Sequence, residues 1–195
     1  MSLHQHTTHV GTARLLTNAL NPFFVFTALY VLVALSEAST TSRASLFVGT
    51  ELVAATFVAG HVFLLRRRRR VGDFWISARA ERLAPALILL GAFAVLLGAL
   101  ALLGAPEDLL LTTLSMGLGT ATVAAVTSIW KASAHSTVAG HATAAGLLVL
   151  GALGLVFVAV LPAVLWSRVA SGAHTPAQVL AGAGVGAAFA LLFLA

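Results

Sequence analysis

The feature that most constrains this chain is an uncharged stretch of 31 residues, Ser136–Trp166, which contains no Asp, Glu, Lys or Arg. As one continuous helix it would be about 46 Å long, whereas the hydrocarbon core of a bilayer is about 30 Å thick. The stretch is therefore too long for one upright span. We expect a hairpin of two short helices that turns near the Gly-Ala-Leu-Gly segment at 151–154. A single long span is the alternative.

The composition of the whole chain supports a membrane location. Hydrophobic residues make up 59% of the 195 residues and charged residues only 9%, whereas a soluble domain carries about 25% charged residues. We predict an all-α, polytopic membrane helical bundle of about six to seven transmembrane helices, forming a single integral membrane domain over 1–195. Residues 1–14 are expected to be a flexible tail. Besides the hairpin, the predicted spans are Pro22–Leu35, Leu46–Leu65, Ala84–Leu103, Leu109–Trp130 and Pro176–Ala195.

The basic residues are distributed unevenly between the two ends of these spans. If the loop with Arg66 to Arg70 is cytoplasmic, the hairpin layout places ten of the eleven basic residues on that side. Only Arg43 falls on the other side, as the positive-inside rule expects. The net charge of +5 is thus explained by orientation in the membrane rather than by a nucleic-acid partner. We expect an inner-membrane protein whose polar cluster faces the cytoplasm. The ten basic residues are Arg14, Arg66, Arg67, Arg68, Arg69, Arg70, Arg79, Arg82, Lys131 and Arg168.

Three polar segments meet at this basic end under the hairpin layout. They are SARAERLAP (77–85), WKASAHS (130–136) and WSRVASGAHTPAQ (166–178). Two imidazoles among several fixed cations suit an anionic phosphate group, because Arg donates paired hydrogen bonds to phosphate oxygens and His acts as nucleophile or acid near neutral pH. The chain has no Cys, which excludes disulfides and thiolate chemistry. The candidate residues are Arg79, Arg82, Lys131, His135, Arg168 and His174.

The spacing of these residues resembles a known family. Ser167-Arg168, five residues, His174, three residues and Gln178 are similar to the third signature of the type 2 phosphatidic acid phosphatases, which ends in Asp. Ser133-Ala134-His135 is similar to that family's second signature, Pro-Ser-Gly-His. The first signature, Lys, six residues, Arg-Pro, is matched poorly by Arg82 and Pro85, with Arg79 one turn earlier. The resemblance covers about 75–190, which would be the phosphatase-like core.

The resemblance implies a metal-independent lipid phosphatase without a cofactor. By position, His174 would attack phosphorus to form a phosphohistidine, and His135 would protonate the leaving oxygen. Arg168, Arg82 and Arg79 would hold phosphate oxygens, and Ser133 would donate a further hydrogen bond. Lys131 has no position in the family, but it is close enough in sequence to contribute. The substrate would be a lipid phosphate or diphosphate, with isoprenoid and glycerolipid tails both open.

One position departs from the family pattern. The Asp that orients the nucleophilic His is replaced by Gln178, which lies four residues after His174 and therefore next to it on a helix. Its carbonyl can accept the imidazole N–H, but it supplies no negative charge. We therefore expect either a slow phosphatase or a non-catalytic protein that binds or transports a lipid phosphate on the same helices.

Several of these residues also have structural interpretations. Arg79, Arg82 and Arg168 are also explained by anchoring at a membrane surface. His141 is expected to pack between helices. Glu51 and His61 are considered as a proton-relay pair, although a spacing of ten residues does not place them on one helix face. The GAGVG segment at 182–186 is expected to be a close-packing face.

Overall fold

The computed structural model describes residues 3–72, 81 and 83–195, and within these ranges it is built from helices without strands. The helices are α1 (Leu3–Ala19), α2 (Pro22–Glu37), α3 (Thr41–Arg67), α4 (Leu83–Leu102), α5 (Glu107–Thr127), α6 (Ala134–Leu150), α7 (Leu155–Ala170) and α8 (Pro176–Leu194). The predicted all-α membrane bundle is confirmed, because six helical stretches of the described chain are long and apolar enough to cross a bilayer. They are Gly11–Glu37, Thr41–Arg67, Leu83–Leu102, Glu107–Thr127, Ala134–Ala170 and Pro176–Leu194.

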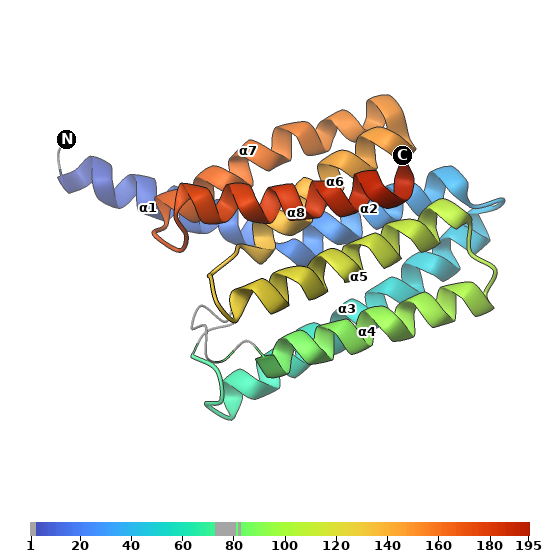
Figure 1. The fold of residues 1–195 in the computed structure, drawn as a ribbon, viewed down its shortest axis with the longest axis horizontal. Helices are drawn as coiled ribbons and strands as arrows, with labels where there is room; N and C mark the ends of the chain where they lie inside the picture. Colours follow the sequence, from blue (N-terminus) through green and yellow to red (C-terminus); the bar gives the residue numbers. More distant parts are fainter. Residues whose placement is uncertain (1–2, 73–80, 82) are drawn as a thin grey trace.

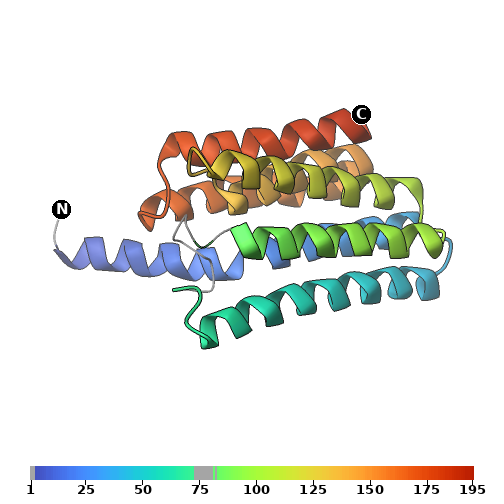
Figure 2. The ribbon, with the colours of Figure 1, turned by 60° about the horizontal axis from the view of Figure 1, so that its bottom comes forward.

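The helices run lengthwise side by side, with α6 at the centre of the bundle (Figures 1 and 2). Helix α6 packs against α2, α5, α7 and α8, whereas α3 packs against α2 and α4 at the periphery. Capping residues set where the helices begin. Asn21 accepts the backbone N–H of Phe24 at 3.1 Å to start α2, and Thr40 accepts that of Arg43 at 3.2 Å to start α3. Such caps satisfy N–H groups that have no partner within the helix.

The expected hairpin is confirmed. A short 3₁₀ turn at Gly151–Gly154 separates α6 from α7, and Thr143 of α6 donates a hydrogen bond to the carbonyl of Phe157 in α7 at 3.0 Å. A Cβ on Gly154 would come within 2.1 Å of the Gly146 carbonyl oxygen, so glycine allows the two arms to meet at the turn. The arms have 17 and 16 residues. Each is about 25 Å long, slightly shorter than the hydrocarbon core.

Residues 3–14 of the expected tail belong to a helix in the structure. Helix α1 begins at Leu3 and continues to Ala19. Its second half packs against α7, with Ala13 fully buried and Thr17 nearly so. This packing gives the segment a partner that the sequence does not reveal, because α7 lies about 150 residues away along the chain.

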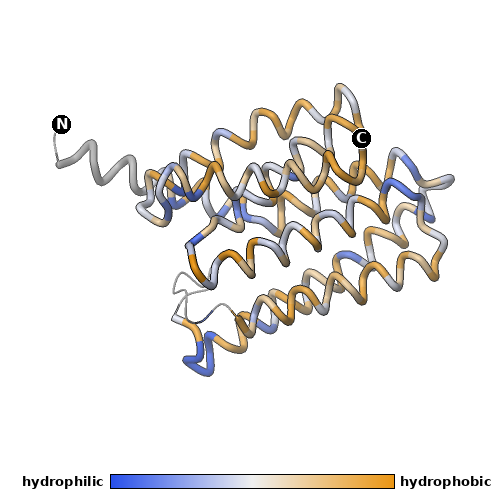
Figure 3. The backbone as a smooth tube through the Cα atoms, in the orientation of Figure 1, coloured by the Kyte–Doolittle hydropathy of each residue, from blue (hydrophilic) through white to orange (hydrophobic). Residues whose placement is uncertain are grey.

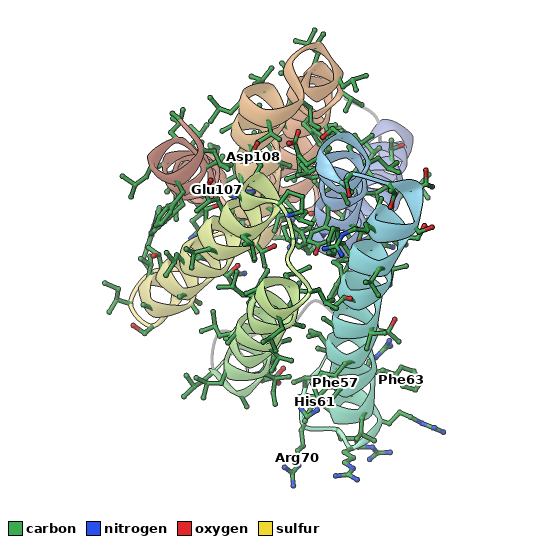
Figure 4. The ribbon with its side chains drawn as sticks, turned by 90° about the vertical axis from the view of Figure 1, so that its right-hand side faces the viewer. Phe57, His61, Phe63, Arg70, Glu107 and Asp108 are labelled. Atoms are coloured by element: carbon green, nitrogen blue, oxygen red, sulfur yellow. The ribbon has the colours of Figure 1, made fainter. Side chains whose placement is uncertain are left out.

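Polar residues gather at the two ends of the bundle (Figure 3). One end carries the C-terminus of α3 with Arg66–Arg70, the α5–α6 loop and the α7–α8 loop (Figure 1). The opposite end carries Glu107 and Asp108 at the start of α5 (Figure 4). The arrangement of helices therefore places the basic run and the segments around His135 and His174 at the same end. Trp130 and Trp166, both partly exposed there, are of the type that marks a membrane–water interface.

Candidate active site

The loop between α7 and α8 fixes the spacing between Arg168 and His174. Two residues after the end of α7, Gly172 has the left-handed conformation at φ +71°, which glycine adopts without strain. The N–H of Gly172 bonds to the carbonyl of Val169 at 2.9 Å, and the N–H of Ala173 bonds to that of Arg168 at 3.1 Å. This pair of bonds is the Schellman motif of helix C-termini. The N–H of His174 also bonds to the Arg168 carbonyl at 3.1 Å, so the loop returns His174 to the end of α7.

Helix α8 begins directly after His174. Thr175 is its N-cap and accepts the N–H of Gln178 at 3.4 Å, while the side-chain oxygen of Gln178 accepts the N–H of Thr175 at 3.1 Å. This reciprocal pair is a capping box. The residues from Arg168 to His174 thus include the end of α7 and the loop that leads to the start of α8. Burial leaves both side chains less than one-tenth exposed.

The structure gives Gln178 a role that the sequence analysis missed. Its carbonyl oxygen bonds to the backbone of Thr175, whereas we expected it to hold the imidazole of His174. The Thr-x-x-Gln pattern followed by an apolar run is the sequence signal that predicts this cap. The contact between Gln178 and the imidazole stays a prediction.

Helix α6 begins with a serine cap beside α8. Ser133 is fully buried, and its hydroxyl oxygen accepts the N–H of Ser136 at 3.3 Å and the hydroxyl of Ser136 at 2.9 Å. Two accepted bonds leave the hydroxyl hydrogen of Ser133 to donate to another acceptor. His135 lies in the first turn of α6 and is also less than one-tenth exposed. The positive end of the α6 dipole therefore lies next to His135.

Close packing of α6 on α8 brings the two histidine segments to the same end. A Cβ on Gly182 would lie 2.6 Å from the Ser133 carbonyl oxygen, and one on Gly186 would lie 1.9 Å from that of Thr137. Both helices advance by four residues between these contacts, so they run parallel. The close-packing role expected for GAGVG is confirmed at Gly182 and Gly186.

Lys131 ties the two loops together. Its ammonium group donates a hydrogen bond to the Ala173 carbonyl at 2.9 Å, which is the residue before His174. Hydrogen bonds to the backbone thus connect the segments of Lys131, Arg168 and His174 into one group, with Ser133 and His135 at the start of the adjoining helix α6. Arg79 and Arg82 lie outside the described residues. A group that sequence reasoning missed is Thr17 of α1, whose hydroxyl donates to Ser167 at 3.3 Å.

His141, His61 and Glu51 have neighbours elsewhere in the bundle. His141 is fully buried, and its Nε2 lies 2.8 Å from the hydroxyl of Ser115 in α5, which confirms its packing role between helices. Glu51 accepts a hydrogen bond from Thr27 in α2 at 2.9 Å. His61 lies beside Phe57 on α3, with 6.5 Å between ring centroids (Figure 4). Glu51 and His61 thus have different neighbours.

No family model, curated protein or solved structure matches this chain.

Proposed function

We propose that this chain is a membrane phosphatase that hydrolyses a lipid phosphate or diphosphate through a phosphohistidine intermediate. The observation that carries the proposal is the connected group of Lys131, Arg168 and His174 beside the α6 N-terminus. Arg168, His135 and His174 are each less than one-tenth exposed, and burying ionisable groups is costly, so such groups often serve a function. Their spacing is that of the resembled phosphatase family.

The proposed chemistry is the one that the resembled family implies for these positions. The imidazole of His174 attacks phosphorus, a P–N bond forms, and the bond from phosphorus to the leaving oxygen breaks. His135 donates its proton to that oxygen. Water then attacks phosphorus and gives a proton to His135, the P–N bond breaks with its electron pair returning to the His174 imidazole, and inorganic phosphate leaves. Arg168 holds phosphate oxygens, and Ser133 directs its hydroxyl hydrogen to them. Lys131 holds the loop that carries the nucleophile.

The site end of the bundle suits a lipid substrate. The exposure of Trp130 and Trp166 at this end supports a position at the level of the lipid headgroups. A phosphate group would reach the basic cluster while its tail stays among the apolar helices. We propose that this end faces the cytoplasmic side of a cell inner membrane, because Arg66–Arg70 lie at the same end.

The test is phosphate release by the purified protein in detergent, across a panel of isoprenoid and glycerolipid phosphates and diphosphates. His174→Ala should reduce release by about 10⁴-fold or more, the scale of the loss when a catalytic triad residue is replaced. His61→Ala is the matched control, because His61 lies on peripheral α3, and it should retain activity. Quenching without acid should trap phosphohistidine in the wild type only. Full activity of His174→Ala would refute the assignment.

A second candidate is a non-catalytic protein that binds or transports a lipid phosphate. The observation that favours it is Gln178, which caps α8 and brings no negative charge to His174. In this case the purified protein binds lipid phosphate in a manner that depends on Arg168, but it releases no phosphate from any member of the panel.

A further inference from the structure

A groove lies between α3 and α4 at the periphery of the bundle. Its volume is about 970 Å³, and its walls run from Ser45 to Phe57 on α3 and from Leu87 to Ala99 on α4. Volumes of this size are typical of ligand pockets. Phe57 and Leu87 are both 60% exposed, so the groove opens sideways towards the bilayer. Its walls include none of the residues of the proposed phosphatase site.

The shape and lining of the groove suit a hydrocarbon chain. Each wall is about 18 Å long, which is more than half of the hydrocarbon thickness of about 30 Å. Gly49 and Gly91 face open space, because a Cβ at either position would meet nothing within 4 Å. The hydroxyl of Thr50 donates to the Leu46 carbonyl at 2.8 Å, so it needs no partner from a ligand. The groove is therefore an apolar channel that is open to the membrane.

One end of the groove lies below the arginine run at 66–70. The guanidinium group of Arg43, near the start of α3, donates to the Gly104 carbonyl just after α4 at 2.9 Å. Helices α3 and α4 are therefore antiparallel, and α4 starts beside the end of α3. Leu87 is one turn inside the start of α4, so the groove begins about 6 Å below that level. Figure 4 shows Phe57 and Arg70 towards this end of α3.

The arginine run carries charge that the described part of the chain does not neutralise. All five side chains are exposed, and Arg67 lies over the Phe63 ring, 5.6 Å from its centre. The nearby carboxylate of Glu81 accepts the N–H of Gly72 at 2.9 Å. The C-terminus of α3 supplies only about half a unit of negative charge, against five positive charges. A positive patch therefore remains beside the end of the groove.

We propose that an anionic phospholipid of the bilayer binds here, with its phosphate headgroup at Arg66–Arg70 and one tail in the groove between α3 and α4. Basic residues at a membrane surface attract anionic headgroups, and Arg donates paired hydrogen bonds to phosphate oxygens. The positive patch selects the headgroup, and the groove holds the chain. The site therefore distinguishes an anionic from a zwitterionic lipid, and its binding does not depend on hydrolysis at the proposed phosphatase site.

Native mass spectrometry of the purified protein in detergent tests this proposal, with phosphatidylglycerol and phosphatidylcholine of identical tails as probes. The wild type should bind one phosphatidylglycerol in strong preference to phosphatidylcholine. Replacing Arg66, Arg68 and Arg70 together by Gln should lower this preference about 100-fold, because each basic residue near the surface contributes roughly five-fold. Replacing the same three residues by Lys is the matched control and should retain most of the preference, because the charge is kept.

Gly91→Leu tests the groove. Its side chain should occupy the space of the tail and lower the binding of both lipids about 10-fold or more. Gly98→Leu is the matched control, because Gly98 lies on the same helix and also faces open space, but it does not line the groove. Gly49→Leu on the facing wall replaces Gly91→Leu if that variant does not fold.

Three results would overturn the proposal: equal binding of the two lipids by the wild type, an unchanged preference in the Gln variant, or equal lipid binding by Gly91→Leu and Gly98→Leu. The same spectra report the oligomeric state. A dimer that Gly91→Leu dissociates would place a second copy of the chain on the groove and would also overturn the proposal.

Discussion

Replacing Gly186 by Ala should separate α6 from α8 and disturb the candidate active site. A Cβ at this position would lie 1.9 Å from the Thr137 carbonyl oxygen and 2.8 Å from the His141 backbone nitrogen. Both atoms belong to the α6 backbone and cannot rotate away. The helices must therefore move apart by about 1 Å to restore the 3.0 Å separation that real Cβ atoms keep. Overpacking of this kind costs about 1–3 kcal/mol.

Gly184 provides the matched control on the same helix. A Cβ there would meet nothing within 4 Å, and Ala is favoured over Gly in a helix interior by about 1 kcal/mol. Gly184→Ala should therefore raise the melting temperature, whereas Gly186→Ala should lower it. The helix-propensity gain is common to both variants, so the expected difference between them in unfolding free energy is the overpacking cost of about 1–3 kcal/mol.

The same displacement should affect catalysis, because His135 lies on α6 and His174 directly precedes α8. A misplacement of about 1 Å can cost roughly 100-fold in rate. We expect phosphate release by Gly186→Ala to fall by about this factor, with Gly184→Ala unchanged. Thermal unfolding in detergent and the phosphate-release assay measure the two effects. Equal stability and equal activity of the two variants would refute the close contact between α6 and α8.

Three other predictions address the α7–α8 loop and the orientation of the chain. Gln178→Asp should raise phosphate release about 10-fold or more, which is part of the roughly 10⁴-fold effect of a carboxylate in a comparable triad. A fall in phosphate release with an unchanged melting temperature would contradict a role of residue 178 in supporting His174. Gly172→Ala should lower the unfolding free energy by about 1–2 kcal/mol through backbone strain alone, because a Cβ at this position would meet nothing within 4 Å. Gly172→Asn should lower it less in the thermal unfolding assay. In intact cells, an impermeant thiol reagent should label Ser39→Cys but not Ser128→Cys, since these exposed positions lie at opposite ends; the reverse pattern would place the site outside.

Much of the fold is predictable from the sequence because bilayer thickness limits where an apolar chain can turn. The length of Ser136–Trp166 predicted the hairpin, and the glycines at 151 and 154 predicted its turn. The hairpin layout likewise predicted that the segments around His135 and His174 share an end with Arg66–Arg70. The packing of α1 against α7 was not predictable, because Thr17 and Ser167 carry no pattern that relates two segments so far apart in the chain.

The candidate site was predictable where local backbone geometry determines it. Arg168 and His174 are six residues apart because a helix end, a left-handed glycine and the approach to a new helix need that length. The sequence contains the signals for this, namely Gly172 and the Thr175 cap. The parallel packing that brings His135 to the same end depends instead on close backbone contacts between α6 and α8, which the glycines permit but do not specify.

Gln178 shows why a residue four positions after a nucleophile is difficult to interpret from sequence. It is also the third residue of α8, where an acidic or amide side chain is favoured by the helix N-terminus itself. Its oxygen has two lone pairs, and one of them accepts the Thr175 N–H. The amide therefore maintains the loop that carries His174 without supplying the charge that stabilises a protonated imidazole. Because these two roles are physically separate, an Asp at this position should alter the rate much more than the stability.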